Sequence, residues 1–529
     1  MDIYYGGTVL TMEEETDREG KVNAVCVEKG RIIFVGEEQE ARQRFPQAEF
    51  HNLRGGVMMP AFIDAHSHLS SAASESLQIA LENVRNMKQL REVLLEYVDR
   101  NQIKPGVWIR AKGFDHNQME EKAFPDLEFL DKLLPDNPFL LQHKSGHMGV
   151  LNSIALEKLG ITADTPSPKG GLIGKRDGRL TGYMEENAFI ECLKKIGGPE
   201  LNQFMDAIEE MQDKYASYGI TTVQEGMMAS QMIPLYRELM HRRYLKLDVV
   251  GYGDVNSAEE FREAFESSIG KYDRNFKLGG YKIFLDGSPQ GRTAWMLEPY
   301  EGEEEYCGYG TLTDSQVLAA VKKAADTNMQ LLAHCNGDAA ADQYIRMAEK
   351  AAAEGYDIES MRLVMIHAQL LRREQMKEVK DLGMIPSFFV AHVYHWGDVH
   401  RENFGEKRAS EISPAGTALK YEIPFTFHQD NPVIEPDMLE TVWCAVNRTT
   451  REGRILGQEE CIPVYEALKA VTINAAHQYF EENEKGSVRE GKWADLVVLD
   501  KNPLKVPKEE IKNIRVMATY RHGVPVYRR

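Results

Sequence analysis

Side chains that can bind a metal ion follow short apolar segments at well-separated places in this sequence. They are His66 and His68 in PAFIDAHSH, Lys282 in YKIFLDGS, His334 in MQLLAHC, His367 in MRLVMIH and Asp430 in FTFHQD. Imidazole and carboxylate groups are natural ligands of Zn²⁺ and related ions. If the fold brings these segments together, their side chains predict a metal centre.

Each of these residues also has an ordinary structural explanation. A single histidine after a strand, such as His334 or His367, is often only hydrogen-bonded. Asp430 precedes Asn431-Pro432 and would suit an Asx turn, and Lys282 would suit a lysine that extends its amine to the rim of a sheet. All of these explanations would have to hold independently in five separate segments, so we favour a shared metal centre.

The elements around these residues alternate between strand and helix. The stretch 204–219 has a helical apolar face that ends at Gly219, and Asp314 is expected to cap the helix that leads to His334. Eight alternating strand and helix units, counted from the strand that ends at His68, predict a closed parallel (β/α)8 barrel of the TIM type. The ligands would then follow strands 1, 4, 5, 6 and 8, at the face where such barrels carry active sites. Residues two apart in a strand point the same way, so His66 and His68 would face the centre together.

The two ends of the chain resemble each other in composition. Residues 22–36 form a hairpin pattern around Lys29-Gly30, and the segment from Gly486 to Arg529 also has short β-branched runs with glycine turns. Neither end has enough strands to be stable alone. We therefore predict one small β-sandwich built from both termini, with these divisions: 1–58 for its N-terminal part, 59–480 for the barrel and 481–529 for its C-terminal part. A large insertion over about 77–200 would cover the barrel mouth.

Composition excludes some classes of partner. The 529 residues include 82 acidic and 63 basic side chains, giving a formal net charge of −19, which argues against binding to nucleic acid or to an anionic membrane. A small-molecule substrate is compatible with this charge. The sequence has no apolar stretch of the roughly 18 residues typical of a membrane helix, and its start has no signal-peptide pattern. We expect a cytoplasmic protein with free thiols, and a homodimer because twofold assembly is common.

Longer motifs make the sequence resemble the amidohydrolase superfamily. Beside the six residues above, the closing GSVREGKWADLVVLD is similar to that superfamily. The finer pattern resembles its YtcJ-like branch, amidohydrolase family 3, which includes N-substituted formamide deformylases. The stretches that carry this resemblance are GFDHN at Gly113, SGHMGVLNSIAL at Ser145, TGYMEENA at Thr181, FLDGSPQGRTA at Phe284 and HCNGDAAAD at His334.

The resemblance implies a ligand set and a reaction. His66 and His68, with Asp430, would hold one divalent ion, and His334 with His367 would hold a second. Lys282 would bridge the two ions as a carbamate formed with CO₂, a role that a desolvated lysine with a lowered pKa can take. Zinc is the first choice of metal, and the sequence leaves open whether one or two ions bind. The implied reaction is hydrolysis of an amide-type C–N bond, with Asp430 moving the proton.

Further side chains are predicted to contact the substrate, each with a structural alternative. His147 would either reach the pocket or hold the insertion loop, and Glu185 would either face the ligand or be solvated. Asp286 and Arg292 flank the loop after strand 4: Arg292 would bind a substrate oxygen, or the two residues would only pair and order this Gly-rich loop. His395 and Trp396, in the cluster with His392 and His400, would either form a wall for an apolar amine substituent or pack a loop.

Two other functions stay open at this point. The same centre would also suit cyclic amides or N-acyl amino acids, because this type of barrel hosts many chemistries through its loops. A non-catalytic scaffold that kept the fold is the alternative from another class, although all six ligand positions are intact. Metal content would separate the scaffold from the enzymes, and a substrate screen would separate the two kinds of enzyme.

Overall fold

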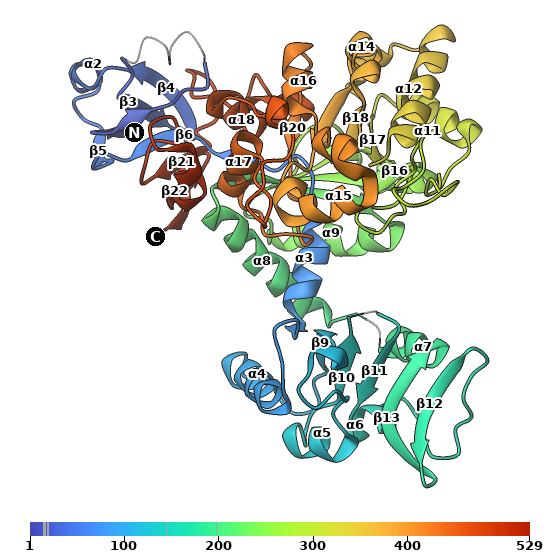
Figure 1. Cartoon of the computed structure of the whole chain (residues 1–529). Helices are drawn as coiled ribbons and strands as arrows, with labels where there is room; N and C mark the ends of the chain where they lie inside the picture. The colour runs from blue at the N-terminus through green and yellow to red at the C-terminus, as the bar shows by residue number, and fades with distance from the viewer. Residues whose placement is uncertain (14–16, 18–20, 145, 197) are drawn as a thin grey trace. The chain divides into compact units, whose positions relative to one another are not determined.

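A computed structural model describes residues 1–13, 17, 21–144, 146–196 and 198–529. The chain divides into two compact units (Figure 1). One consists of residues Met1–Ala72 and Ile208–Arg529, and the other of Ala73–Ala207. The helices α3 (Leu69–Ser76) and α8 (Leu201–Ser217) run from one unit into the other.

The larger unit contains a parallel eight-stranded sheet that fits a TIM-like barrel. Its strands follow one another in chain order and every neighbouring pair is parallel. They are β7 (Phe62–Ile63), β14 (Ile220–Met228), β15 (Asp248–Asp254), β16 (Phe276–Phe284), β17 (Gln330–Cys335), β18 (Val364–His367), β19 (Ile385–Phe388) and β20 (Thr426–Phe427). Beyond β7 and β20, the His68 N–H donates to Asn431 O at 2.9 Å and the Asp430 N–H to His66 O at 3.3 Å. These bonds join the first and last strands at their carboxyl ends.

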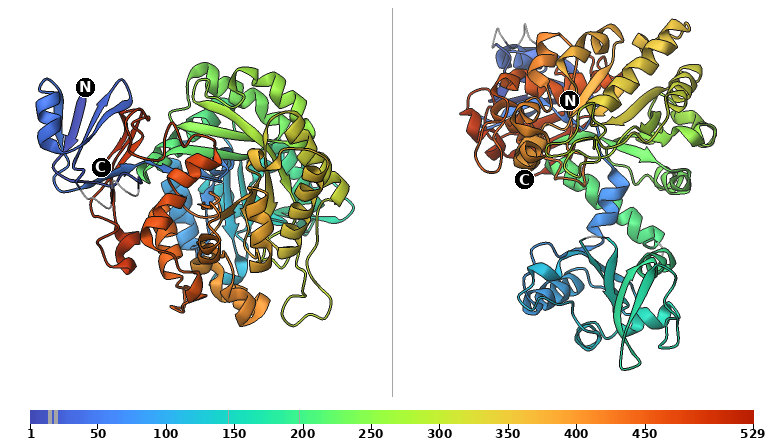
Figure 2. Two further views of the ribbon diagram at one scale, coloured as in Figure 1. Left: turned by 90° about the horizontal axis from the view of Figure 1, so that it is seen from above. Right: turned by 45° about the vertical axis from the view of Figure 1, so that its right-hand side comes forward.

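Helices connect and cover these strands. Figure 1 shows α11, α12 and α14 on the outer side of β16, β17 and β18, and the right-hand view of Figure 2 shows the same yellow and gold helices outside the strands. The helices of this part are α9 (Ile233–Arg242), α10 (Ala258–Ala264), α11 (Asp314–Asp326), α12 (Asp338–Ala353), α13 (Ile358–Met361), α14 (Met376–Asp381), α15 (His392–Ser410), α16 (Ala415–Lys420), α17 (Met438–Asn447), α18 (Val464–Ala470) and α19 (Ile473–Gln478). Short 3-10 turns are η2 (Ser230–Met232), η3 (Val255–Ser257), η4 (Glu266–Ser268), η5 (Arg373–Gln375), η6 (Gln458–Glu460) and η7 (Lys508–Asn513).

Side chains from the strands fill the barrel interior. Ile63, Val250, Leu332, Ile366 and Ile385 come from five different strands and belong to one buried cluster, as in the layered cores of such barrels. One expected helix start differs from the structure. Thr313 caps α11 in a capping box with Gln316, and Asp314 is the first helical residue. Threonine at this position receives the backbone N–H three residues on, which leaves Asp314 to interact with the helix dipole.

The two termini form two sheets that share a core. One sheet has the order β4-β3-β1-β5, and the other has the order β2-β6-β21-β22-β23. The strands are β1 (Asp2–Tyr5), β2 (Thr8–Val9), β3 (Ala24–Glu28), β4 (Arg31–Gly36), β5 (Glu49–Asn52), β6 (Val57–Pro60), β21 (Leu496–Leu499), β22 (Val516–Arg521) and β23 (Val524–Arg528), with α2 at Glu38–Arg44. The N-terminal β6 pairs with the C-terminal β21, and blue and red strands lie side by side in Figures 1 and 2. Tyr4, Val25, Met58 and Leu496 pack in one buried cluster drawn from both sheets.

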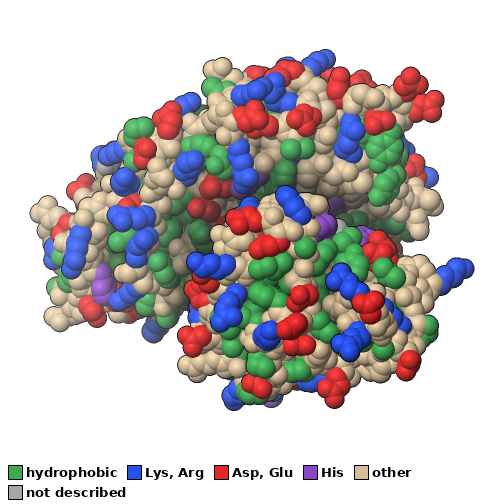
Figure 3. Space-filling view, turned by 60° about the horizontal axis from the view of Figure 1, so that its bottom comes forward, with side chains coloured by type: hydrophobic (Ala, Val, Ile, Leu, Met, Phe, Trp, Pro, Cys, Tyr) green, Lys and Arg blue, Asp and Glu red, His purple; other side chains and the backbone are tan. Residues whose placement is uncertain are grey.

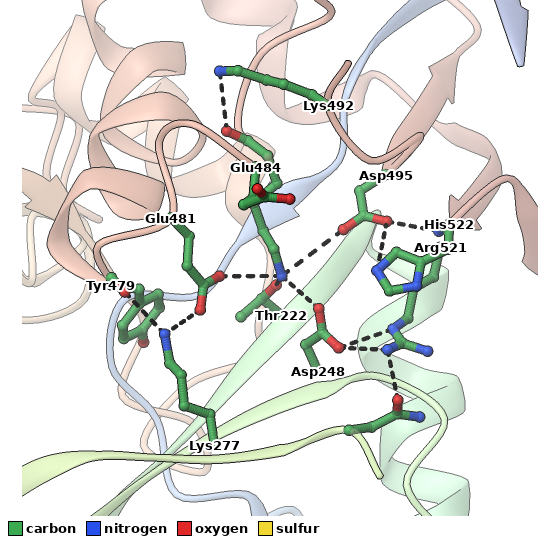
Figure 4. A network of polar contacts seen from close by, with 12 residues as sticks. Thr222, Asp248, Lys277, Tyr479, Glu481, Glu484, Lys492, Asp495, Arg521 and His522 are labelled. Carbon is green, nitrogen blue, oxygen red and sulfur yellow. Dashed lines mark hydrogen bonds and ion pairs between the residues drawn. The ribbon is translucent and has the colours of Figure 1, made fainter. Parts of the chain in front are cut away.

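A buried ionic network, in which Figure 4 labels Asp248, Lys277, Glu481 and Arg521, links the amino ends of barrel strands to the C-terminal segment. Lys485 Nζ lies 2.5 Å from Asp248 Oδ2 and 3.1 Å from Glu481 Oε2. Arg521 Nη2 lies 2.5 Å from Asp248 Oδ1, and Lys277 pairs with Glu481. Asp248 and Lys277 belong to β15 and β16, whereas the other three residues follow α19. Since this end of a barrel contributes to stability rather than to catalysis, we treat the network as structural.

The smaller unit has a sheet of its own, in the order β12-β13-β11-β10-β9-β8. Its elements are β8 (Ile79–Ala80), α4 (Met87–Arg100), β9 (Ile109–Phe114), η1 (His116–Gln118), α5 (Leu127–Leu133), β10 (Phe139–His143), β11 (Met148–Leu151), α6 (Ser153–Lys158), β12 (Gly171–Arg176), β13 (Arg179–Glu186) and α7 (Asn187–Ile196). Two hydrophobic clusters, around Leu141 and around Phe189, fill it. It contains the segment 77–200; the idea that this segment covers the barrel mouth stays a prediction.

The surface and the helices bear on the expected partners. On the face shown in Figure 3, Lys and Arg side chains are interspersed with Asp and Glu side chains. Among the described residues, no helix combines the length and the apolar character needed to cross a membrane.

Candidate metal centre

His66 and His68 lie just beyond the first barrel strand. We expected the strand to reach His68, but β7 ends at Ile63. The chain turns there to meet the end of the last strand, and His68 keeps only an isolated bridge to Glu225. The two imidazoles still come together, with ring centroids 5.0 Å apart. Helix α3 begins at the next residue, and its Ser70 N–H donates to Glu225 Oε2 at 2.8 Å. The start of this helix therefore fixes the position of the histidine pair.

The carboxylate of Asp430 lies among three histidine nitrogens. Its Oδ1 is 3.2 Å from His68 Nε2 and 3.5 Å from His66 Nε2, and its Oδ2 is 3.8 Å from His367 Nε2. Asp430 Oδ1 is buried and accepts no hydrogen bond in the part of the chain that the structure describes. A buried carboxylate oxygen without a donor is costly. A cation held between Asp430 Oδ1 and the ring nitrogens would remove this cost.

Lys282 extends from β16 into the same cluster. Its Nζ lies 3.3 Å from His66 Nε2, and its side chain is buried. Burial lowers the pKa of Lys282 to about 7, although the charge of Asp430 acts in the opposite direction. An amine with this pKa is largely neutral slightly above neutral pH, the form that can react with CO₂.

His334 and His367 complete the cluster on the next two strands. Their ring centroids are 4.7 Å apart, and those of His367 and His66 are 5.7 Å apart. His334 is the last residue but one of β17, and His367 is the last residue of β18. The side chains predicted as ligands on strands 1, 4, 5, 6 and 8 thus meet at the carboxyl ends of these strands.

Two of these residues have an unusual backbone. His367 has φ 74° and Asp430 has φ 54°, and Ala368 beside His367 has φ 44°. A residue with a side chain rarely adopts this left-handed region, and such strain concentrates at functional sites. The fold therefore holds these two side chains in place at a conformational cost.

The protonation states suit a cation. Burial lowers the pKa of His66 and of His367 well below the usual range, so both rings are neutral. Burial raises the pKa of Asp430, but His68, His428 and Lys282 outweigh burial and keep the pKa below its ordinary value. Neutral imidazoles and an ionised carboxylate are the metal-binding forms of these groups. The residues present therefore fit a divalent ion.

The ligand histidines have hydrogen-bond partners behind them. His66 Nδ1 lies 2.5 Å from Gln224 Oε1, and His334 Nδ1 lies 3.2 Å from Asp286 Oδ1. Such partners hold a ligand ring in one orientation and leave its other nitrogen for the metal.

Sequence reasoning missed two of these partners, Gln224 and His428. His428 Nε2 lies 3.0 Å from His367 Nδ1, and burial lowers the pKa of His428 to about 3. His428 stands two residues before Asp430, so the period of a strand was a signal for it. Gln224 gave no comparable signal, because its contact depends on the packing of two distant segments.

Among the described residues, three other groups of potential ligands are already satisfied or peripheral. They are Asp115 with His116 and His143, Asp248 with Asp495 and His522, and Asp2 with Glu49 and His51. The Asp115 carboxylate accepts bonds from Lys144 Nζ, from Gln118 Nε2 and from the Asn117 N–H. Asp248 is bound by the two cations of the buried network, and the third group lies at the surface. The group of His66, His68 and Asp430 differs because, among the residues that the structure describes, no lysine or arginine lies within ion-pair distance of its carboxylate.

Four predicted substrate residues lie in the larger unit. Asp286 is buried and accepts the N–H groups of Trp295, Asn336 and Gly337 besides His334 Nδ1. Arg292 binds Glu303 and the Glu301 carbonyl, not Asp286. Their contact with substrate stays a prediction.

The pair after strand 7 is part of an aromatic cluster. His395 Nε2 lies 2.9 Å from Glu440 Oε1. The Trp396 ring packs against Phe389 and His392, at centroid distances of 6.1 and 4.5 Å. Phe389 in turn lies 6.1 Å from His367, so this cluster begins beside the ligands.

The other two predicted substrate residues belong to the smaller unit. His147 Nδ1 lies 3.1 Å from Glu186 Oε2, and Glu185 accepts a hydrogen bond from Tyr183 at 2.7 Å. Ser145, in the same SGHMG motif as His147, lies outside the described residues. A role of His147 and Glu185 toward substrate stays a prediction.

Known proteins resemble this chain over its length. A model of the Amidohydrolase family matches residues 49–527. An N-substituted formamide deformylase of Arthrobacter pascens is 30% identical over 527 residues, which cover 97% of this chain and 96% of that protein. A Bacillus subtilis (strain 168) protein named as the amidohydrolase YtcJ is 28% identical over 546 residues, which cover 99% of each chain.

The fold is also shared with a solved structure. An uncharacterized metal-dependent hydrolase from Pyrococcus furiosus has a TM-score of 0.77 and 24% identity, and the match covers 95% of this chain and all of that one (100%). The cluster of predicted ligands at the carboxyl ends of the barrel strands, the family match and this shared fold agree. The chain belongs to the amidohydrolase family.

Proposed function

We propose that the protein is a metal-dependent hydrolase that cleaves an amide-type C–N bond in a small molecule. The observation that carries this proposal is the buried Asp430 carboxylate, which faces three histidine nitrogens and has an oxygen without a hydrogen-bond donor among the described residues. The neutral rings of His66 and His367 beside an ionised carboxylate make a ligand set that a structural role would not require.

The residues divide into two possible positions for a divalent ion, zinc foremost. His66, His68 and Asp430 would hold one, and His334 and His367 would hold another, with Lys282 between them. Carboxylation of Lys282 would make it a bridge: the Nζ lone pair forms a bond to the carbon of CO₂, and one N–H proton leaves, giving an anionic carbamate. When bound, such ions polarise a carbonyl oxygen and make water a stronger nucleophile.

Asp430 would move the proton. Its carboxylate is ionised and buried, with a position fixed by a strained backbone. It would accept a proton from the attacking water and deliver it to the nitrogen of the departing amine, so that the C–N bond breaks to a neutral amine. His66 and His367, whose pKa values are lowered by burial, keep neutral rings, and they do not exchange protons in this scheme.

An N-substituted formamide is the favoured substrate class, because the deformylase relative is similar over nearly the whole chain. Cyclic amides and N-acyl amino acids are the alternative classes. Purified protein loaded with Zn²⁺ should release formate and an amine from N-substituted formamides, and the Asp430→Asn variant should not. Turnover of cyclic amides or N-acyl amino acids alone would replace the substrate class. A metal-loaded protein that hydrolyses none of the three classes would refute the proposal.

A further inference from the structure

We propose that His428 is a positioning residue, which holds the ligand His367 through a hydrogen-bonded chain that begins at Ser387. The inference rests on the metal centre of the proposed function. His428 itself is not among the predicted ligands. It contacts Nδ1 of His367, whereas the other ring nitrogen of His367, Nε2, faces Asp430.

The three side chains are joined by two successive hydrogen bonds across the last barrel strands. Ser387 Oγ is 2.9 Å from His428 Nδ1, and His428 Nε2 is 3.0 Å from His367 Nδ1. All three residues are buried, with relative exposures of 0%, 0% and 4% for Ser387, His428 and His367. Backbone pairing fixes their spacing, because β18, β19 and β20 are consecutive strands and the His428 N–H donates to Phe388 O.

The direction of the protons follows from the geometry. His367 Nε2 is the nitrogen that faces Asp430, at 3.8 Å from Oδ2, so Nε2 must keep its lone pair to bind a metal. Its ring proton then lies on Nδ1 and is donated to His428 Nε2. His428 can accept there only if its own proton lies on Nδ1, where Ser387 Oγ accepts it. Each bond in the chain thus sets the tautomer of the next ring.

This arrangement differs from the supports of His66 and His334. Gln224 and Asp286 present oxygen atoms to His66 and His334. A carboxylate oxygen is always an acceptor, and an amide oxygen is one once the amide is oriented. An imidazole nitrogen is an acceptor in only one tautomer, so His428 needs a second contact that selects this tautomer. Ser387 supplies that contact, which gives the buried hydroxyl a role that packing alone would not.

The strained backbone of His367 makes this support necessary. With φ at 74°, His367 departs from the strand conformation at its last residue. Its ring therefore cannot rely on the regular strand for its orientation. The contact with His428 supplies this orientation, so removing His428 should free the His367 ring more than it disturbs the fold.

The test compares His428→Leu, His428→Gln and Ser387→Ala with a matched control. Leucine removes the acceptor, whereas the amide oxygen of glutamine can reach the place of Nε2. His400→Leu is the control: His400 Nε2 lies 3.0 Å from His392 Nδ1 in another buried histidine pair, and within the described part of the chain neither of these two rings is hydrogen-bonded to a predicted metal ligand. Zn²⁺ affinity is measured by chelator competition on the purified full chain, and the melting temperature of each metal-free variant is recorded.

His428→Leu should weaken Zn²⁺ binding by about 10–100-fold, the usual effect of losing such a partner. His428→Gln should recover most of this loss, Ser387→Ala should weaken binding by less than leucine does, and His400→Leu should bind as the wild type. Wild-type affinity in His428→Leu, or an equal loss in His400→Leu, would overturn the inference. If His428→Leu does not fold, the comparison rests on the other two variants. The inference would then be overturned if His428→Gln bound Zn²⁺ no more tightly than Ser387→Ala does. A wild-type protein without bound metal would refute the proposed function as well, whereas a metal-binding, active wild type leaves only the positioning role at stake.

Discussion

The amine of Lys282 lies 3.3 Å from Nε2 of His66, inside the barrel and away from solvent. Burial brings the pKa of this lysine down to about 7. A positively charged lysine at this place would repel a metal ion, whereas a carbamate would attract it. The state of Lys282 therefore decides whether the histidines around it can act as a ligand set for two ions.

We expect CO₂ to be required for full metal uptake. Metal-free protein in CO₂-free buffer should bind less Zn²⁺ than the same protein with bicarbonate, and a ¹³C label from bicarbonate should appear on Lys282 by NMR. Lys282→Met should abolish the dependence on bicarbonate because it has no amine to carboxylate. Equal uptake with and without CO₂, together with an unlabelled lysine, would rule out the carbamate.

Replacing Asp430 by asparagine should reduce turnover by about 10²–10⁴-fold, the range usual for a lost general acid–base group. Asparagine keeps the size of the side chain, so circular dichroism should still report a folded protein. Bound metal is measured in the same sample, because Asp430 is also a predicted ligand. Near-normal turnover with unchanged metal content would remove Asp430 from the role of proton carrier.

Asp286 and Arg292 flank the same loop but should differ in their effect on metal binding. Asp286→Ala removes the partner of His334 Nδ1 and should weaken Zn²⁺ binding by about 10–100-fold. Arg292→Ala should leave this affinity unchanged, since the Arg292 guanidinium binds Glu303 and the Glu301 carbonyl and lies over the Tyr300 ring, and none of these is a predicted ligand or a partner of one.

The kinetic constants of Arg292→Ala address its second predicted role. A higher KM with unchanged metal content would support a substrate clamp, and unchanged kinetics would leave Arg292 as a loop residue. If both variants lost metal equally, the loop as a whole, and not the Asp286 contact, would support His334.

The buried network at the barrel base should control acid stability. Burial raises the pKa of Asp248, but Lys485 and Arg521 outweigh burial and hold the pKa well below its ordinary value of 3.8. A carboxyl with a lowered pKa stabilises the folded state above its unfolded-state pKa, and this stabilisation is lost as pH falls toward the folded-state pKa. The Asp248 contribution should therefore be complete near neutrality and decline below about pH 4.

Asp248→Asn tests this contribution, because it removes the carboxylate that Lys485 and Arg521 share and leaves the buried Lys485 with its longer contacts to Glu481 and Asp495. We expect the free energy of unfolding to fall by about 3–5 kcal/mol at neutral pH, with a weaker decline on acidification than in the wild type. Asp381→Asn is the control, since it breaks an exposed pair with Lys377 and should cost less than about 1 kcal/mol. Equal effects of the two variants in urea unfolding would contradict a stabilising role of the network.

The sequence predicted the barrel and the ligands more readily than their supports. The ligands His334, His367 and Asp430 were visible because each follows an apolar run, and parallel strands bring such ends to one face. The predicted end of the first barrel strand at His68 was wrong, because the chain leaves strand geometry after Ile63 to meet the end of the last strand. That closure depends on tertiary packing, which local patterns do not contain.

The supports of the ligands depend on contacts between distant segments. Gln224 and His66 are 158 residues apart in the chain, and His428 and His367 are 61 apart. A glutamine within ITTVQEG has no feature that distinguishes it from any other strand residue. Its role became apparent only when the structure placed its side-chain oxygen against a ligand ring.

The central claim is that the cluster of His66, His68 and Asp430 binds a metal ion. X-ray diffraction data recorded at the zinc absorption edge, from crystals of the Zn²⁺-loaded protein, test it directly. We predict an anomalous peak at about 2.0–2.1 Å from Nε2 of His66 and of His68, in contact with the Asp430 carboxylate. Crystals of the loaded protein without an anomalous peak at this cluster would contradict the account.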